Sequence, residues 1–260
     1  MPPTPLSERL RLKLVERVRG VFNDVESGQQ PVPTSDEALF PKDSPIRMVH
    51  ADIVAMMVGG IRGLLLQMLH PAVLAGVWDH SDFRADMHGR LRRTAKFIAV
   101  TTYDHAGAGQ AAIDKVNRIH KKLGGTLPDG TAYRVSDPAL LAWVHVTETI
   151  SFLDAWIRYA RPDMPLVEQD AYFDEMARVG QALGADPLPR SRAGTEALIQ
   201  SYHPQLRADA RTREVADMVE WGGFDAVGHF DLVKRYGYQH YGGYEPERFR
   251  AVIQPVLDRM

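Results

Sequence analysis

The chain has 260 residues, of which 45% are hydrophobic and 25% are charged, so it can bury a large core and is not a disordered tail. Its 31 basic and 33 acidic side chains give a formal charge of -2, which argues against a strongly basic nucleic-acid binder. Cysteine is absent, which excludes disulfides, thiolate-bound metals and thiol catalysis, so that a metal must be bound by His, Asp, Glu or Tyr.

No targeting or transmembrane segment is expected. The N-terminal MPPTPLSERLRLKLVERVRG is charged and amphipathic, unlike a signal peptide. The most apolar stretch, 48–69, contains Asp52 and Arg62, and its uncharged run 53–61 is far shorter than the roughly 20 apolar residues that a bilayer requires. These features favour a cytoplasmic protein.

Helical spacing of apolar residues dominates the chain and predicts a single all-α globular domain over residues 1–260. Asp137 and Pro138 form a helix start signal, LPDGTAY suits a tight hairpin, and Pro204 should break a helix. A loop is expected around 78–83, while 222–243 favours no element. The predicted helices cover 6–18, 48–69, 87–103, 109–123, 138–159, 167–184, 192–220 and 246–258.

Arg90, Arg93 and Thr94 share one stripe of the helix at 87–103, because they are three and four residues apart. Two guanidinium groups beside a hydroxyl form a donor-rich face that suits a carboxylate, a phosphate or a polar substrate atom. The commoner role of such a stripe is a solvated basic face.

His120 lies on the apolar face of the next helix, four residues after Val116 and three before Leu123. A histidine that points inward can bind a metal or haem through a neutral ring nitrogen. A hydrogen-bonded core histidine is the more frequent case, so the spacing leaves both interpretations open.

His145 and Glu148 are three residues apart, which is the spacing of half a carboxylate-bridged di-metal site. No second pair with this spacing is found, so a buried hydrogen bond between the two is the favoured interpretation and a metal enzyme the weaker one.

Gly59, Gly60 and Gly63 lie within the most apolar helix, where each glycine costs about 0.5–1 kcal/mol relative to alanine. This cost indicates that something passes close to the backbone, either a crossing helix or a flat cofactor. The chain has no dinucleotide fingerprint, Walker loop, nucleophile elbow or HExxH motif.

The order of these features resembles one family. GGIRGLLLQMLHPAVLAGVWDHSDFRADMHGRLRRT, followed by VNRIHKKLGGTLPDGTAYRVSDPALLAWVH, is similar to the rubber oxygenase/MpaB-type oxygenase catalytic domain, most densely over residues 59–153. The resemblance implies an all-helical fold around a b-type haem, with His120 in the place of the histidine that ligates the iron. Arg90 and Thr94 match the ends of the family's distal Arg-x-x-Lys-Thr motif.

Arg93 stands where that motif has lysine. A guanidinium group stays protonated and has no free lone pair for iron, so the sixth coordination position is expected to be open or occupied by water. By resemblance, Arg90, Arg93 and Thr94 form the catalytic distal group, with Arg93 donating a hydrogen bond to bound oxygen. The expected haem contacts are His120, Arg90, Arg93 and Gly60.

The resulting expectation is a haem-b-dependent oxygenase that uses molecular oxygen on a hydrophobic small molecule of the isoprenoid or alkene kind. The alternative is a haem or hydrophobic-ligand binding protein without turnover, such as a sensor or carrier. Neither role involves nucleic acid.

Overall fold

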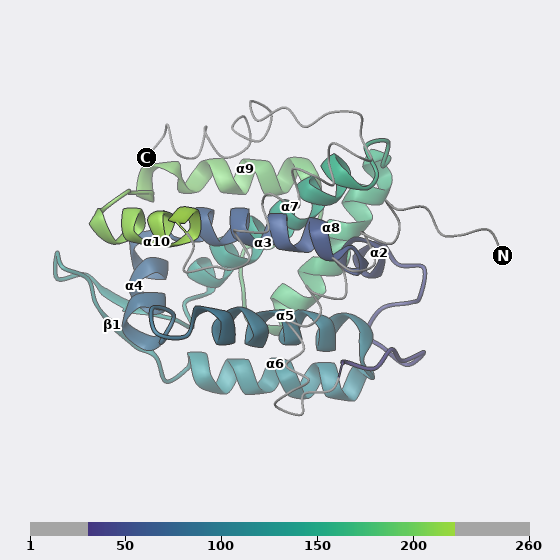
Figure 1. Ribbon diagram of the computed structural model, residues 1–260, viewed down its shortest axis with the longest axis horizontal. Helices are drawn as coiled ribbons and strands as arrows, with labels where there is room; N and C mark the ends of the chain where they lie inside the picture. The colour runs from purple at the N-terminus through teal and green to yellow at the C-terminus, as the bar shows by residue number, and fades with distance from the viewer. Residues whose placement is uncertain (1–30, 222–260) are drawn as a thin grey trace.

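The computed structural model describes residues 31–221, in which nine α-helices, one short 3-10 helix and a two-stranded sheet form a mostly helical single domain (Figure 1). The predicted helices at 6–18 and 246–258 and the stretch 222–243 lie outside these residues. The elements are α2 (Pro45–Ala51), α3 (Ile53–Gln67), α4 (Pro71–His80), α5 (Met87–Tyr103), α6 (Ala106–His120), β1 (Gly124–Thr126), β2 (Ala132–Arg134), α7 (Pro138–Tyr159), α8 (Leu166–Ala182), α9 (Arg192–Tyr202), η1 (His203–Gln205) and α10 (Ala210–Trp221).

The prediction of one continuous helix over 48–69 was wrong at Asp52. This residue has an extended backbone, and its carboxylate accepts a hydrogen bond from the Ala55 amide at 2.8 Å, so it ends α2 and caps α3. The two helices meet at a bend of 93°. Among the described helices none is by itself long and apolar enough to cross a membrane. α2 and α3 together reach that length and apolar character, but only as a pair with a sharp bend between them.

The loop expected around 78–83 begins later than predicted, because α4 continues to His80. The preceding helix stops before His70 and Pro71 as expected, and Pro71 occupies the first turn of α4, where its missing amide hydrogen costs no hydrogen bond. Leu74 and Ala75 then bury the inner face of this unpredicted helix.

Most other boundaries follow the sequence signals closely. α5 and α7 have the predicted bounds, Asp137 caps α7 through the amides of Ala139 and Leu140, and η1 contains the predicted break at Pro204. α6 ends at His120 rather than at 123, because Gly124 and Gly125 enter β1 instead of capping the helix. The hairpin forms with antiparallel β1 and β2 as expected.

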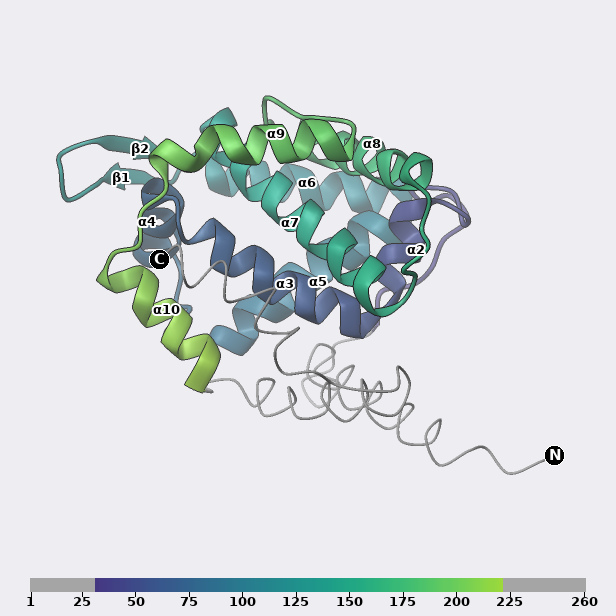
Figure 2. The ribbon, with the colours of Figure 1, turned by 90° about the horizontal axis from the view of Figure 1, so that it is seen from above.

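α7 is the central helix of the domain, with α3 on one side and α9 on the other (Figure 2). Its side chains Trp143 and Leu153 are fully buried in two separate apolar clusters. α5 and α6 run antiparallel beside each other along one edge of the domain (Figure 1). These packed helices provide a rigid frame for the cavity described below.

Gly59 and Gly63 allow α3 and α7 to cross at short range. A Cβ on Gly59 would stand 2.7 Å from the Phe152 Cα, and one on Gly63 would stand 3.3 Å from the Glu148 Cα. The crossing helix, one of the two explanations offered by the sequence, therefore accounts for these two glycines.

Candidate functional site

A cavity of about 580 Å³ lies between α2, α3, α5 and α7 and is continued by residues 31–34. Its volume is in the range of small-molecule sites, about 300–1,000 Å³. The apolar lining includes Ile53, Met56, Met57, Ile61, Leu64, Ile98 and Phe152. The polar lining includes Thr34, His50, Gln67, Arg90, Thr94, Lys96, Tyr103 and Glu148. Mostly apolar walls with a few polar groups suit a hydrophobic ligand that is oriented by one or two polar contacts.

Gly60 lines this cavity, unlike Gly59 and Gly63. A Cβ on Gly60 would meet only the Phe152 ring, at 3.7 Å, so this glycine is not required by the helix crossing. It keeps the cavity wall of α3 free of a side chain, which leaves room for a flat group to approach the helix.

Arg90 and Thr94 come together at the cavity from successive turns of α5. The Thr94 hydroxyl donates to the Arg90 carbonyl oxygen at 3.2 Å. Burial lowers the pKa of the Arg90 guanidinium, and the charge of Arg93 lowers it further. The two residues thus give the cavity wall a cation and a hydroxyl.

Arg93 shares the α5 stripe but does not line the cavity. Its side chain is 65% exposed, and one of its terminal nitrogens lies 3.5 Å from a carboxylate oxygen of Asp86. The Asp86 carboxylate also caps α5 by accepting from the Gly89 amide. The role of Arg93 as an oxygen-side donor remains a prediction.

His120 is the last residue of α6, and its Nδ1 is buried without a hydrogen-bond partner in the described part of the chain. Burial lowers the pKa of the imidazole, which keeps it neutral. Gly109 of α6 lies against α5, where a Cβ on this glycine would stand 3.7 Å from the Thr101 Cα. His120 is not among the residues that line the cavity.

His145 and Glu148 point to different neighbours, and the favoured hydrogen bond between them is absent from the described contacts. The His145 ring packs near Gly180 of α8, whereas Glu148 lines the cavity. Burial lowers the pKa of His145 to about 4 and raises that of Glu148 to about 7. Within residues 31–221 no group of three or more His, Asp or Glu side chains is arranged to bind a metal ion.

His50 is a cavity residue that the sequence reasoning missed. Its Nδ1 lies 2.9 Å from the Thr102 hydroxyl, and its Nε2 lies 3.4 Å from the Tyr172 hydroxyl. Burial lowers the His50 pKa to about 3, so the ring is neutral. The sequence signal that could have indicated this residue is its spacing, because His50 follows the apolar Ile46 by four residues and therefore shares its helix face.

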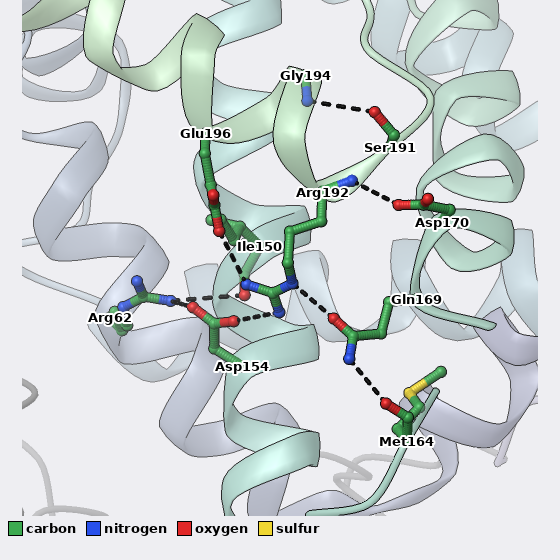
Figure 3. Close-up of polar contacts among 10 residues, drawn as sticks. All are labelled: Arg62, Ile150, Asp154, Met164, Gln169, Asp170, Ser191, Arg192, Gly194 and Glu196. Atoms are coloured by element: carbon green, nitrogen blue, oxygen red, sulfur yellow. Dashed lines mark hydrogen bonds and ion pairs between the residues drawn. The ribbon is translucent and has the colours of Figure 1, made fainter. Parts of the chain in front are cut away.

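A second polar cluster lies around Asp154 and joins four helices (Figure 3). Arg62 donates to one carboxylate oxygen of Asp154 at 2.8 Å, and Arg192 donates to the other at 2.6 Å. Arg192 also donates to Gln169 of α8 and Glu196 of α9. None of these side chains lines the cavity, and the cluster connects the cavity helices α3 and α7 to α8 and α9 behind them.

The fold and cavity define a mostly helical protein with an apolar cavity of small-molecule size. Its family is shown by comparison: residues 47–255 match the model for the ER-bound oxygenase mpaB/B'/Rubber oxygenase, catalytic domain, and the chain belongs to this family. The resemblance stated from the sequence is thereby confirmed, and with it an oxygenase-type assignment. The comparisons with curated proteins and with solved structures gave no significant match.

Proposed function

We propose that this protein is a haem-b-dependent oxygenase that holds a hydrophobic substrate of the isoprenoid or alkene kind in the cavity between α2, α3, α5 and α7. The observation that carries the proposal is the apolar cavity with Arg90 and Thr94 on its wall, in a chain of an oxygenase family. The cytoplasmic location expected from the sequence stays a prediction.

The donor chemistry at His120 fits a haem ligand. Its imidazole is neutral, and its buried Nδ1 has no hydrogen-bond partner in the described structure, so no internal contact competes for the ring. We assign His120 as the residue that would hold the iron. Haem would supply the redox-active iron on which dioxygen is activated.

The chain's own residues then shape the reaction chamber. The apolar side chains of α3 and α5 bind the substrate and exclude water, and Gly60 leaves open space along α3. Arg90 presents hydrogen-bond donors on the α5 wall, and the Thr94 hydroxyl, whose hydrogen is donated to the Arg90 carbonyl, presents an acceptor oxygen.

Arg93 would have to leave its ion pair with Asp86 to join this wall. Such an exposed pair contributes at most about 1 kcal/mol, so a small gain inside the cavity is enough to compensate for its loss. Because this ion pair is weak, we propose that Arg93 can turn into the cavity and donate a hydrogen bond to bound oxygen.

Binding without turnover is the alternative, because a mostly apolar cavity of this size serves a carrier or sensor equally well. The two are separated by incubating purified holoprotein with a linear isoprenoid alkene, such as squalene, under isotopically labelled dioxygen. Oxygenase activity predicts labelled aldehyde or ketone products, in smaller yield from Thr94→Val. Stoichiometric alkene binding with no labelled product would identify a carrier.

A further inference from the structure

Arg90 is a cation in the cavity wall that no described acidic side chain neutralises. Its guanidinium makes no ion pair or hydrogen bond within residues 31–221, and the only charge that influences its pKa is the repulsive one of Arg93. Arg90 is partly buried and lines the cavity, and burial is the larger cause of its lowered pKa.

Glu148 is the one acidic residue of the described cavity lining, and it does not serve as the partner of Arg90. Burial alone raises the pKa of Glu148, with no lowering by a nearby cation, and the pKa of Arg90 shows no influence of Glu148. The described ion pairs and hydrogen bonds contain no contact between these two groups.

A partly buried charge without a partner is destabilising, and a ligand that brings the opposite charge offsets this cost. A guanidinium group binds a carboxylate through two parallel hydrogen bonds, which makes a carboxylate the best matched anion. The rest of the chamber is mostly hydrocarbon, from residues such as Met56, Ile61 and Ile98. The complete ligand is consequently apolar along most of its length and anionic at one end.

We propose that Arg90 binds the carboxylate of an amphipathic ligand whose hydrocarbon chain fills the cavity. When the substrate supplies the carboxylate, this narrows the substrate class of the proposed function to long-chain acids, and the inference rests on that function only in using the same cavity. The carboxylate has two chemical sources, a substrate headgroup or a propionate of the prosthetic group. Both present the same anion to Arg90.

Calorimetric titration of the full-length protein with dodecanoate and with dodecanol tests the proposal, since the two probes differ in charge and share a chain. We expect wild type to bind dodecanoate at least about tenfold more tightly, a factor within reach of one charge-assisted contact. Arg90→Gln should erase this preference. Lys96→Gln is the matched control, because Lys96 is a cation of the same cavity that is exposed to solvent, and it should keep most of the preference.

Titration with haem and with its dimethyl ester on the same variants identifies the source of the carboxylate. If wild type binds the dimethyl ester more weakly than haem and Arg90→Gln binds both equally, the carboxylate that Arg90 binds is a propionate. If wild type prefers dodecanoate to dodecanol, the carboxylate belongs to the substrate. The proposal would be overturned if wild type bound both members of each probe pair equally. It would also be overturned if Arg90→Gln, with a native circular dichroism spectrum, kept the preference for the charged probe. A protein that binds dodecanoate through Arg90 but takes up no haem would leave this inference standing while refuting the haem-dependent function.

Discussion

Gly59 of α3 faces α7 so closely that a Cβ on this glycine would stand 2.7 Å from both the Cα of Phe152 and the carbonyl oxygen of Ser151. Because the obstructing atoms belong to the backbone, Gly59→Ala should force the two helices apart. We expect a loss of about 1–3 kcal/mol in the free energy of unfolding, which is typical of overpacking. Chemical denaturation followed by circular dichroism measures it.

Gly60→Ala is the matched control one residue away. Its Cβ would make an ordinary contact of 3.7 Å with the Phe152 ring, and alanine is favoured over glycine in a helix by about 0.5–1 kcal/mol. This variant should be as stable as wild type or more so, while its smaller cavity weakens ligand binding. Equal stability of the two variants would contradict the close crossing of α3 and α7.

Arg192 connects α7, α8 and α9 through Asp154, Gln169 and Glu196. Arg192→Met should destabilise the protein by about 1–3 kcal/mol, because partly buried acceptors lose a charged donor. Arg190→Met is the control, since Arg190 pairs with Asp174 where both side chains are about half exposed, and its loss should cost at most about 1 kcal/mol. Thermal unfolding of the two variants compares them, and a larger loss in the Arg190 variant would refute the importance assigned to the Asp154 cluster.

Glu148 should make the stability of the protein fall as the pH rises. Burial raises its pKa in the folded state to about 7 from an ordinary value of 4.5. As the pH rises from 4.5 to about 7, the carboxyl loses its proton in the unfolded chain but keeps it in the folded protein. The free energy of unfolding therefore decreases over this range, by at most about 3 kcal/mol. The measurement is the free energy of unfolding across this pH range in wild type and Glu148→Gln.

The variant comparison is needed because two histidines act in the opposite direction. The pKa values of His50 and His145 are lowered by burial to about 3 and about 4 from 6.5, so their contribution to stability is complete above 6.5 and is lost as the pH falls. These slopes are shared by wild type and Glu148→Gln, and the difference between the two curves isolates Glu148. A free-energy difference between the two proteins that stays constant from pH 4.5 to 7 would contradict the raised pKa of Glu148.

Local sequence signals predicted the helices whose ends are set by local chemistry. Asp137 followed by Pro138 fixed the start of α7, and the Pro-Asp-Gly turn fixed the hairpin, because capping and turn preferences depend only on neighbouring residues. Asp52 was misjudged, since a lone acidic residue in an apolar run is equally compatible with a helix interior and with a cap.

The cavity required tertiary information. Periodicity placed Arg90 and Thr94 on one face but gave no means of separating Arg93, which shares the face and turns outward to Asp86. His50 and Glu148 meet at the same chamber from helices about a hundred residues apart, and no spacing rule joins them. His145, which the sequence paired with Glu148, instead packs toward α8 because the two side chains leave α7 in different directions.

The most direct test of the account is the absorption spectrum of freshly purified protein, with haem quantified against protein, for wild type, His120→Ala and His203→Ala. His203 is an exposed histidine of η1 and serves as the control. We predict a Soret band and near-stoichiometric haem in wild type and His203→Ala, and a strong loss of haem in His120→Ala with helical content retained. An unchanged ratio of haem to protein in His120→Ala, or wild-type protein that takes up no haem when it is supplied, would contradict the central claim.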